Sequence, residues 1–175
     1  MGRYFNPEQI SLAHSSFQQA EGLMSRHFRL SPEKVRAHPY DVKTLAFLDD
    51  HEVRKEAFAH LCKYHYRKEE AGQERGFHFY RICLQDDRIL DAVDRAHSFI
   101  KLSPLLLYIA VHELVHVLRF ENGEVAFDLS RQEQRREEDK VHAITRDLLQ
   151  SCLRPELQLV LDCFSNRYQL NDLCT

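Results

Sequence analysis

The N-terminal part of the chain places apolar residues at every third or fourth position between residues 10 and 28. This spacing gathers them on one face of a helix, and Asn6 followed by Pro7 is a typical helix start. We therefore predict an amphipathic helix from about Asn6 to Phe28. Its apolar stripe consists of Ile10, Ala13, Phe17, Ala20, Met24 and Phe28.

Shorter patterns of the same kind continue up to residue 66. Ser31-Pro32 marks one further helix start, and Asp41 marks another that is followed by Val42, Leu45 and Leu48. Between residues 50 and 66 the positions that fall on one side of a helix are Val53, Ala57, Leu61 and His65. We therefore expect residues 1–68 to form a helical N-terminal part.

The pattern changes after residue 68. Residues 69–76 are polar and include two glycines, so a loop is expected there. Residues 77–84 are rich in aromatic and β-branched side chains and lie between Gly76 and Asp86, which predicts a strand. A helix should resume after this strand, through Ile89, Leu90, Val93 and His97.

The second half of the chain reads as three helices. A long apolar run follows Ser103 and stops near Gly123, and Ser130 with Glu133 forms a capping-box pattern for a helix to about Leu153. A short final helix follows. Since the chain has only five glycines and five prolines, we predict a single domain over residues 1–175 that is mainly α with a small β element (α+β).

Composition and charge exclude several classes of protein. The formal charge of −3 and the pI near 6.4 give no electrostatic footprint for DNA or RNA binding. No apolar run follows a basic start, and the longest apolar stretch, residues 105–118, is too short to span a bilayer. The five cysteines form no C-x-x-C pair and are expected to be free thiols. We expect a cytoplasmic protein with no nucleic acid or membrane partner.

The candidate chemistry lies in residues 112–116, which read His-Glu-Leu-Val-His inside a strongly apolar helical run. Four residues is little more than one helical turn, so His112 and His116 project from one face and can bind one zinc ion (Zn²⁺). Glu113 lies beside that face and can take a proton from water at the metal. Polar side chains in such a helix are costly to bury unless a partner such as a metal satisfies them.

A catalytic zinc needs a third protein ligand. The positions where metzincin peptidases carry a glycine and a third histidine hold Arg119 and Asn122, so that class is excluded. The alternative is a glutamate from a following helix, and residues 136–145 resemble that arrangement in the gluzincin class of zinc peptidases. Glu138 and Glu137 both compete for the ligand role, and Glu138 is favoured because it shares a face with His142.

Residues 108–149 also resemble, loosely, the ImmA/IrrE-type bacterial family. That family's pattern of Glu, a small apolar residue, Asn, Phe, Ala and Leu-Leu corresponds here to Glu138, Val141, His142, Ile144, Thr145 and Leu148-Leu149. The chain departs from the pattern at residues 142, 144 and 145. The resemblance implies a zincin-like helical core and Glu138 as the third metal ligand.

Several other residues have an open role. His142 is a candidate catalytic residue that donates to the oxyanion of the tetrahedral intermediate, but it is equally placed to be a fourth metal ligand. Tyr108 lies one turn before the first motif histidine, where core packing competes with a role in the site. His78 and Tyr80 lie on the predicted strand, where an extended substrate could add. His60, Cys62 and His65 lie close together in the sequence, but no partner pair is nearby, so a second metal site is not expected there.

These residues predict a zinc metallopeptidase that acts on a peptide or protein substrate, with Glu113 as general base. A carboxylate-bridged di-iron helical bundle is the first alternative, with Glu-x-x-His and Asp-x-x-His pairs ending at His116 and His142. Its two further carboxylates would come from Glu21, Glu52 or Glu56. The second alternative is a non-catalytic module whose zinc is structural and is held by His112, His116, Glu138 and His142.

Overall fold

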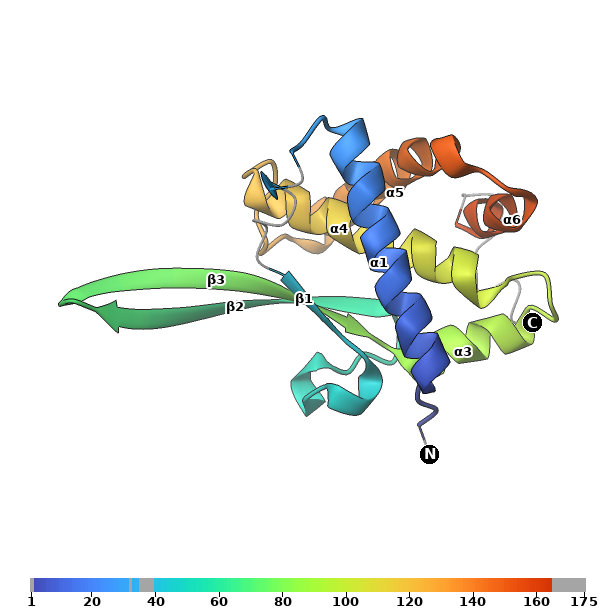
Figure 1. Ribbon diagram of the computed structural model, residues 1–175, viewed down its shortest axis with the longest axis horizontal. Coiled ribbons are helices and arrows are strands. Elements are labelled where there is room, and N and C mark those ends of the chain that lie inside the picture. The colour runs from blue at the N-terminus through green and yellow to red at the C-terminus, as the bar shows by residue number, and fades with distance from the viewer. Residues whose placement is uncertain (1, 32, 35–39, 165–175) are drawn as a thin grey trace.

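The computed structural model describes residues 2–31, 33–34 and 40–164. Five described helices of more than one turn surround a small sheet, so the prediction of a mainly α fold with a small β element is confirmed. Figure 1 shows the helices gathered in one body and a two-stranded hairpin that extends far beyond it. Pro32 and Cys174 lie outside the described residues. At the predicted helix start, residues 33–34 are helical and the hydroxyl of Ser31 accepts a hydrogen bond from the backbone N–H of Lys34 at 3.2 Å.

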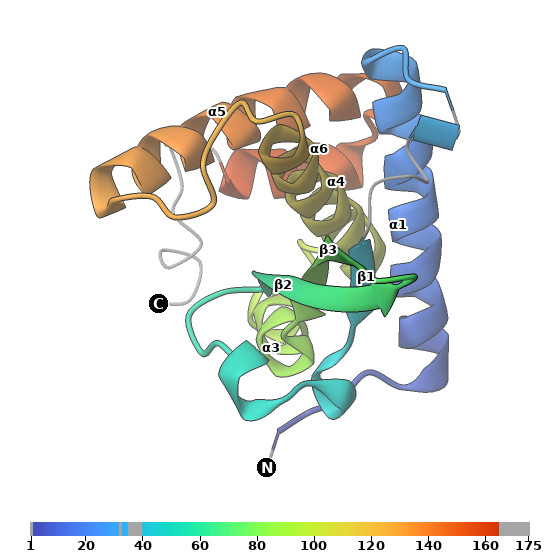
Figure 2. The same cartoon turned by 90° about the vertical axis from the view of Figure 1, so that its left-hand side faces the viewer.

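The long helix α4 (Leu102–Glu121) is the centre of the fold. It is apolar on nearly every side, and helices of that kind are stable only when other elements cover them. Four helices and one strand pack against it: α1 (Pro7–His27), α3 (Asp86–Arg95), α5 (Arg131–Leu149), α6 (Pro155–Cys163) and β2 (Ala59–Glu70). Figure 2 shows α4 almost end-on, with α1 to one side, α5 and α6 above and the sheet below.

By length and apolar composition, α4 would be long enough to cross a membrane. However, 72% of its most apolar window is buried inside the protein. The core helix of a globular protein passes the same test of length and composition, so α4 is only weak support for a membrane span.

The predicted N-terminal helix is confirmed as α1 (Pro7–His27). Asn6 and Gln9 form a complete capping box, in which each side chain bonds the other residue's backbone N–H. The apolar stripe of α1 packs on α4. Its buried residues are Ala13, Phe17, Ala20, Leu23 and Met24.

The remaining helices agree with the sequence pattern. They are α3 (Asp86–Arg95), α5 (Arg131–Leu149) and α6 (Pro155–Cys163). Ser130 and Glu133 close the predicted capping box at the start of α5. The three helices end within a few residues of the predicted positions because the capping and breaking residues are local signals.

The prediction of a helix over residues 50–66 is wrong. Residues 59–70 form strand β2 (Ala59–Glu70), which pairs antiparallel with β3 (Gln73–Leu84). The spacing of Leu61 and His65 fits a helix, but the residues between them alternate in polarity, which equally suits a strand. Residues 59–70 form a strand because they pair with β3 along its whole length.

The polar segment at residues 69–76 is not a loop, which is a second correction. Glu70 pairs with Gln73, so only Ala71 and Gly72 connect the two strands. Both connecting residues have positive φ, 54° and 75°, as a type I′ turn requires. The predicted strand at residues 77–84 therefore exists but begins four residues earlier, at Gln73.

The helix predicted to follow Asp41 is also wrong. Tyr40–Lys43 forms strand β1, parallel to β3, and a single 3₁₀ turn follows at Leu45–Phe47. The sheet order is β1-β3-β2, which leaves β2 at an edge. The expected helical N-terminal part, residues 1–68, is therefore only partly helical: among its described residues, α1 is the one long helix and residues 40–68 supply two strands.

A buried carboxylate joins the strands on the side of the sheet away from α4. Glu52 is fully buried and accepts hydrogen bonds from Arg81 at 3.0 Å, from the hydroxyl of Tyr64, and from the backbone of Asp49 at 2.9 Å. Arg81 also binds Asp41 of β1 through two nitrogens. One network therefore links β1, β2 and β3.

This network predicts a pH-dependent stability. Burial alone would raise the pKa of Glu52, but the hydrogen bonds from Tyr64, Asp49 and Arg81 outweigh it and lower the pKa to about 2. The carboxylate thus stabilises the fold above pH ~4.5, and this stabilisation is lost as the pH falls toward 2. Glu52→Gln should lower the free energy of unfolding by about 2 kcal/mol at pH 7. In urea titrations the deficit should shrink between pH 4.5 and 3.

The matched control is Glu56→Gln, because Glu56 is an exposed glutamate four residues further along the chain. It should leave the free energy of unfolding unchanged at every pH. An equal loss of stability for the two variants would show that the Glu52 network contributes nothing specific.

Candidate metal centre

Helix α4 brings the two histidines of the predicted motif together. His112 and His116 lie one turn apart on the same face, with ring centroids 4.8 Å apart. Their side chains are only 12% and 9% exposed. Two imidazoles buried in an apolar helix need polar partners, because an unsatisfied buried nitrogen is costly.

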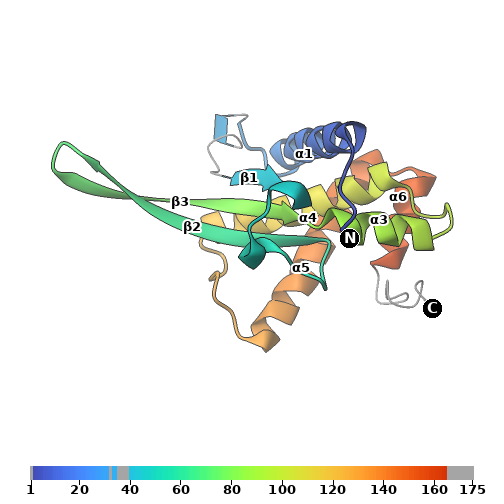
Figure 3. The same cartoon turned by 90° about the horizontal axis from the view of Figure 1, so that it is seen from below.

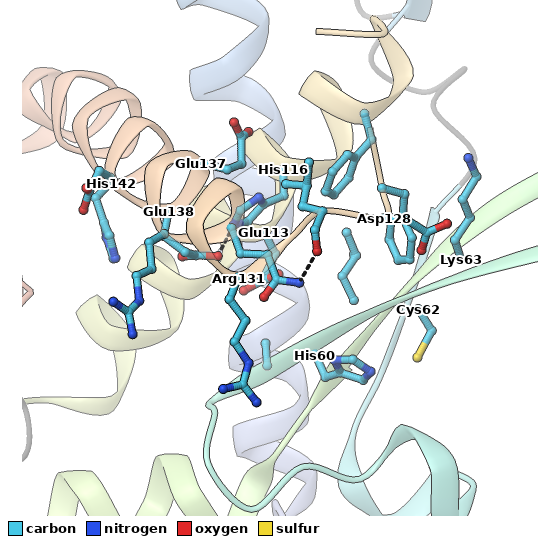
Figure 4. A pocket seen from close by; sticks show the side chains of 18 of the residues that line it. His60, Cys62, Lys63, Glu113, His116, Asp128, Arg131, Glu137, Glu138 and His142 are labelled. Carbon is cyan, nitrogen blue, oxygen red and sulfur yellow. Dashed lines mark hydrogen bonds and ion pairs between the residues drawn. The ribbon is translucent and has the colours of Figure 1, made fainter. Parts of the chain in front are cut away.

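Helix α5 supplies the third group. The Nε2 atom of His112 lies 3.2 Å from Oε2 of Glu138, and that of His116 lies 3.1 Å from Oε1. One ligand atom from each of the three residues lies within 4.8 Å of the other two. Figure 4 shows the carboxylate of Glu138 turned from α5 toward His116.

The arrangement of these ligand atoms fits metal coordination better than it fits direct hydrogen bonds between the three residues. The Nε2 atom of His112 is buried and has no hydrogen-bond partner, although Glu138 is close. A tetrahedral zinc site with bonds of about 2.0 Å places neighbouring ligand atoms about 3.3 Å apart. The nitrogen-to-oxygen distances of 3.1 and 3.2 Å are close to that edge length. The donor set of two imidazoles and one carboxylate is one that zinc commonly takes.

Two carboxylates give the cluster a negative potential. Burial lowers the pKa of His112, but the carboxylates of Glu113 and Glu138 outweigh burial and raise it to about 9. Burial likewise raises the pKa of Glu138, but contact with the two histidines lowers it far below its usual value. The cluster therefore favours a positive charge at the point where the three residues converge.

Glu113 lies beside this group without belonging to it. Its Oε1 atom is 3.3 Å from Nδ1 of His112, and its side chain lines the adjacent pocket. The cluster of converging atoms consists of His112, His116 and Glu138 alone among the described residues. A carboxylate in this position is free to accept and return a proton.

Glu137 has a different partner. It is buried and accepts two hydrogen bonds from Arg119 of α4, at 2.6 and 3.0 Å. The same arginine also donates to Glu124. Glu137 therefore fixes the rotation of α5 against α4, and this rotation turns Glu138 toward the histidines.

His142 lies one turn beyond Glu138 on α5, to one side of its carboxylate (Figure 4). Its Nδ1 atom is hydrogen-bonded to the hydroxyl of Tyr108, and its ring centroid is 4.8 Å from that of His112. His142 is not a member of the converging cluster. Tyr108 itself stacks on Phe164, with ring centroids 4.1 Å apart.

The proton of the Tyr108–His142 bond can be assigned. Burial, with the charge of His112 as the next cause, lowers the pKa of His142 to about 4, so this imidazole is neutral at pH 7. Burial raises the pKa of Tyr108 well above its usual value, so Tyr108 keeps its proton and donates it to Nδ1. In the neutral ring the remaining hydrogen is then on Nε2, where it can be donated to a bound molecule.

A pocket of about 1270 Å³ opens beside the cluster. Its walls come from α4, from the first half of α5 and from residues 59–64 of β2. Glu113, His116, Glu138 and His142 all line it. The site is therefore accessible from one side and closed by the protein core on the other.

The strand beside this pocket is not the one that the sequence pattern indicated. His78 and Tyr80 lie on β3, inside the sheet, where His78 contacts Glu121 and Tyr80 is buried against Phe120. The edge strand β2 lines the pocket instead, and it was misread as a helix. The alternation of Lys63 and His65 with Tyr64 and Tyr66 is the signal that would have identified it.

The residues of the other proposed metal sites are dispersed. Glu21 binds Tyr40, Glu52 lies in the network beneath the sheet, and Glu56 is exposed. None of them approaches the histidines. His60, Cys62 and His65 lie along β2 and form no metal-binding group with other described residues. The geometry gives no support to a di-iron site or to a second metal.

No family model, curated protein or solved structure matches this chain. The resemblance to gluzincins and to the ImmA/IrrE-type family therefore stays a prediction. It rests on the segment from Tyr108 to Leu149.

The two adjacent glutamates give a direct test of the candidate ligand set. Glu138→Gln should weaken zinc binding by at least about 100-fold, because changing even a group behind a ligand typically costs 10- to 100-fold. Glu137→Gln should keep the zinc and lower the melting temperature instead, since it removes the charge that pairs with Arg119. Zinc content after dialysis against a weak chelator, together with thermal unfolding, separates the two effects.

His112→Ala serves as the reference for a lost ligand and should give protein without stoichiometric zinc. The ligand assignment is wrong if Glu137→Gln lowers the zinc content as much as Glu138→Gln does. A full equivalent of zinc in His112→Ala would contradict it as well.

Proposed function

We propose that the protein is a zinc-dependent metallopeptidase that hydrolyses peptide bonds in a peptide or protein substrate. The observation that carries this proposal is the convergence of His112, His116 and Glu138 beside an open pocket, which His116, Glu138 and the carboxylate of Glu113 line. A structural site has no need of that extra carboxylate, whereas hydrolysis requires one.

His112, His116 and Glu138 are the residues that would hold the metal. When bound, a zinc ion supplies a Lewis acid for the carbonyl oxygen and lowers the pKa of water toward ~7. The contribution of the chain to the reaction is proton transfer. Glu113 accepts a proton from the attacking water and returns it to the leaving amine, which otherwise departs poorly as an anion.

His142 stabilises negative charge on the substrate. Its neutral ring, fixed by the hydroxyl of Tyr108, has a hydrogen on Nε2 that can be donated to the carbonyl oxygen as charge develops on it. A donor that is already oriented stabilises the transition state without reorganisation. A hydrogen on Nε2 leaves no lone pair there for a metal, which supports this role over that of a fourth ligand.

The shape of the pocket supports a peptide substrate. Strand β2 is the edge of the sheet, and edge strands expose backbone groups that can pair with an extended peptide. Residues 59–64 of this strand line the same pocket as Glu113. A peptide added along β2 would therefore pass its backbone in front of the candidate catalytic residues.

Glu113→Gln tests the peptidase directly. The variant should keep one equivalent of zinc and the wild-type melting temperature, because Glu113 is not a ligand. Hydrolysis of a mixed peptide library, followed by mass spectrometry, should slow by about 10²- to 10⁴-fold through loss of the general base. Wild-type protein that binds zinc but cleaves no peptide in such a library would leave only a structural role for the metal.

His142 and Tyr108 provide a graded second test. His142→Ala should lower kcat by about 10²-fold with zinc still bound, since one donor to the oxyanion is lost. Tyr108→Phe should lower kcat by less, because it removes only the group that orients His142. If His142→Ala loses its zinc instead, the histidine is a fourth ligand and the site is closed.

A further inference from the structure

One face of α5 looks into the pocket along its first three turns. Arg131, Arg135, Glu138 and His142 follow one another at intervals of four, three and four residues, which places them in one row on the helix. All four line the pocket beside the candidate metal centre. The first half of α5, which carries both arginines, projects from the helical body (Figure 3).

These two arginines have no partner in the part of the chain that the structure describes. Both side chains are exposed, and neither takes part in a hydrogen bond or an ion pair there. By contrast, Arg119 binds two glutamates, and Arg81 binds Asp41 and Glu52. Of the acids within one turn of Arg135 on α5, Glu138 contacts the histidines, and Asp139 forms no ion pair with either arginine.

The position of the pair is unfavourable for the helix itself. Arg131 and Arg135 are four residues apart, where like charges on a helix repel each other. They also lie in its first two turns, where the helix dipole favours negative side chains. The helix dipole and the repulsion between the two arginines therefore disfavour two cations on this face. An anionic ligand bound in the pocket would favour them.

The opposite wall of the pocket also presents a polar group without a partner. His60 of β2 is half-buried, lines the pocket and takes part in no hydrogen bond among the described residues. Figure 4 shows Arg131 extending from the start of α5 toward the strand that carries His60. An anion bound between α5 and β2 would meet cationic and neutral donors on both sides.

We propose that Arg131 and Arg135 form a carboxylate-binding subsite that gives this protein a preference for acidic peptides. The proposal rests on the peptidase function above and names its substrate class. A guanidinium suits this role because its planar fork binds a carboxylate through two parallel hydrogen bonds. Asp128 and Asp139 also line the pocket. They would repel further carboxylates, so a peptide that carries only acidic residues would bind poorly.

The spacing of the row sets the position of the acidic group. Along the axis of α5, Arg135 and Arg131 precede Glu138 by about 4.5 and 10.5 Å, at ~1.5 Å per residue. An extended peptide advances about 3.3 Å per residue. Because α5 crosses β2 at a steep angle (Figure 3), these separations limit how far the carboxylate can lie from the metal centre, and it belongs within about three residues of the scissile bond.

A carboxylate at this distance has two sources, an acidic side chain or the C-terminus of a short peptide. Four fluorescent peptides of one sequence distinguish them: Glu or Gln two residues from the central bond, each with a free or amidated C-terminus. Binding is measured by fluorescence anisotropy with zinc-loaded full-length protein that carries Glu113→Gln, so that the peptides are not consumed.

The binding of these peptides should depend on the arginine pair. Peptides with the preferred carboxylate should bind about 5- to 25-fold more tightly than those without it, the product of two exposed ion pairs of up to about fivefold each. Arg131→Gln with Arg135→Gln should abolish the difference. Arg136→Gln is the matched control, because Arg136 is exposed on the same helix but does not line the pocket, and it should keep the preference.

Reversing the charge of both arginines tests the subsite by a gain of a new preference, which a merely damaged protein would not show. Arg131→Glu with Arg135→Glu should turn the preference toward a peptide with Lys at the same position, with the circular dichroism spectrum unchanged. The proposal is overturned if the four peptides bind equally, if none binds, or if the arginine pair governs binding of a single-stranded RNA oligomer and not of peptides. A carboxylate preference without any cleavage by the wild-type protein would instead defeat the peptidase proposal alone.

Discussion

The burial of two imidazoles inside an apolar helix is the constraint on which the rest of the structure depends. Helix α4 is covered on all sides, and its polar interruption is stable only where a charged partner reaches it. That partner is Glu138, which must come from another helix and must enter at the level of His112 and His116. The position of α5, the buried ion pair that holds it and the opening of the pocket all follow from this one requirement.

Adjacent residues on α5 divide this task. Glu137 fixes the helix through Arg119, while Glu138 faces the histidines, so a rotation of α5 by one residue would exchange their roles. Val141 and Leu148 anchor the second half of the helix in the core, which leaves its first half free to overhang the pocket. A helix with one buried half and one projecting half can hold a rigid centre and an exposed recognition surface at the same time.

The sequence predicted those parts of the fold whose signals are local. The capped starts at Asn6 and Ser130 and the apolar run of α4 gave the helices, and the four-residue spacing of the histidines gave their common face. The β2–β3 hairpin was missed because its signal is a pairing: Leu61 and His65 fit either period, and Ala71 is an unusual residue for a turn with positive φ. For the same reason the sequence did not predict that residues 59–64 of β2, His60 among them, line the pocket.

The free edge of β2 has a consequence for the protein in concentrated solution. An unpaired strand edge that accepts a peptide also accepts the same edge of a second copy, and such pairing is the first step of aggregation. Natural sheets guard against it with charged side chains, of which Lys63 and Arg67 on this strand are examples, and with a neighbouring element that narrows the approach. The first half of α5, which faces residues 59–64 across the pocket, is a neighbouring element of this kind.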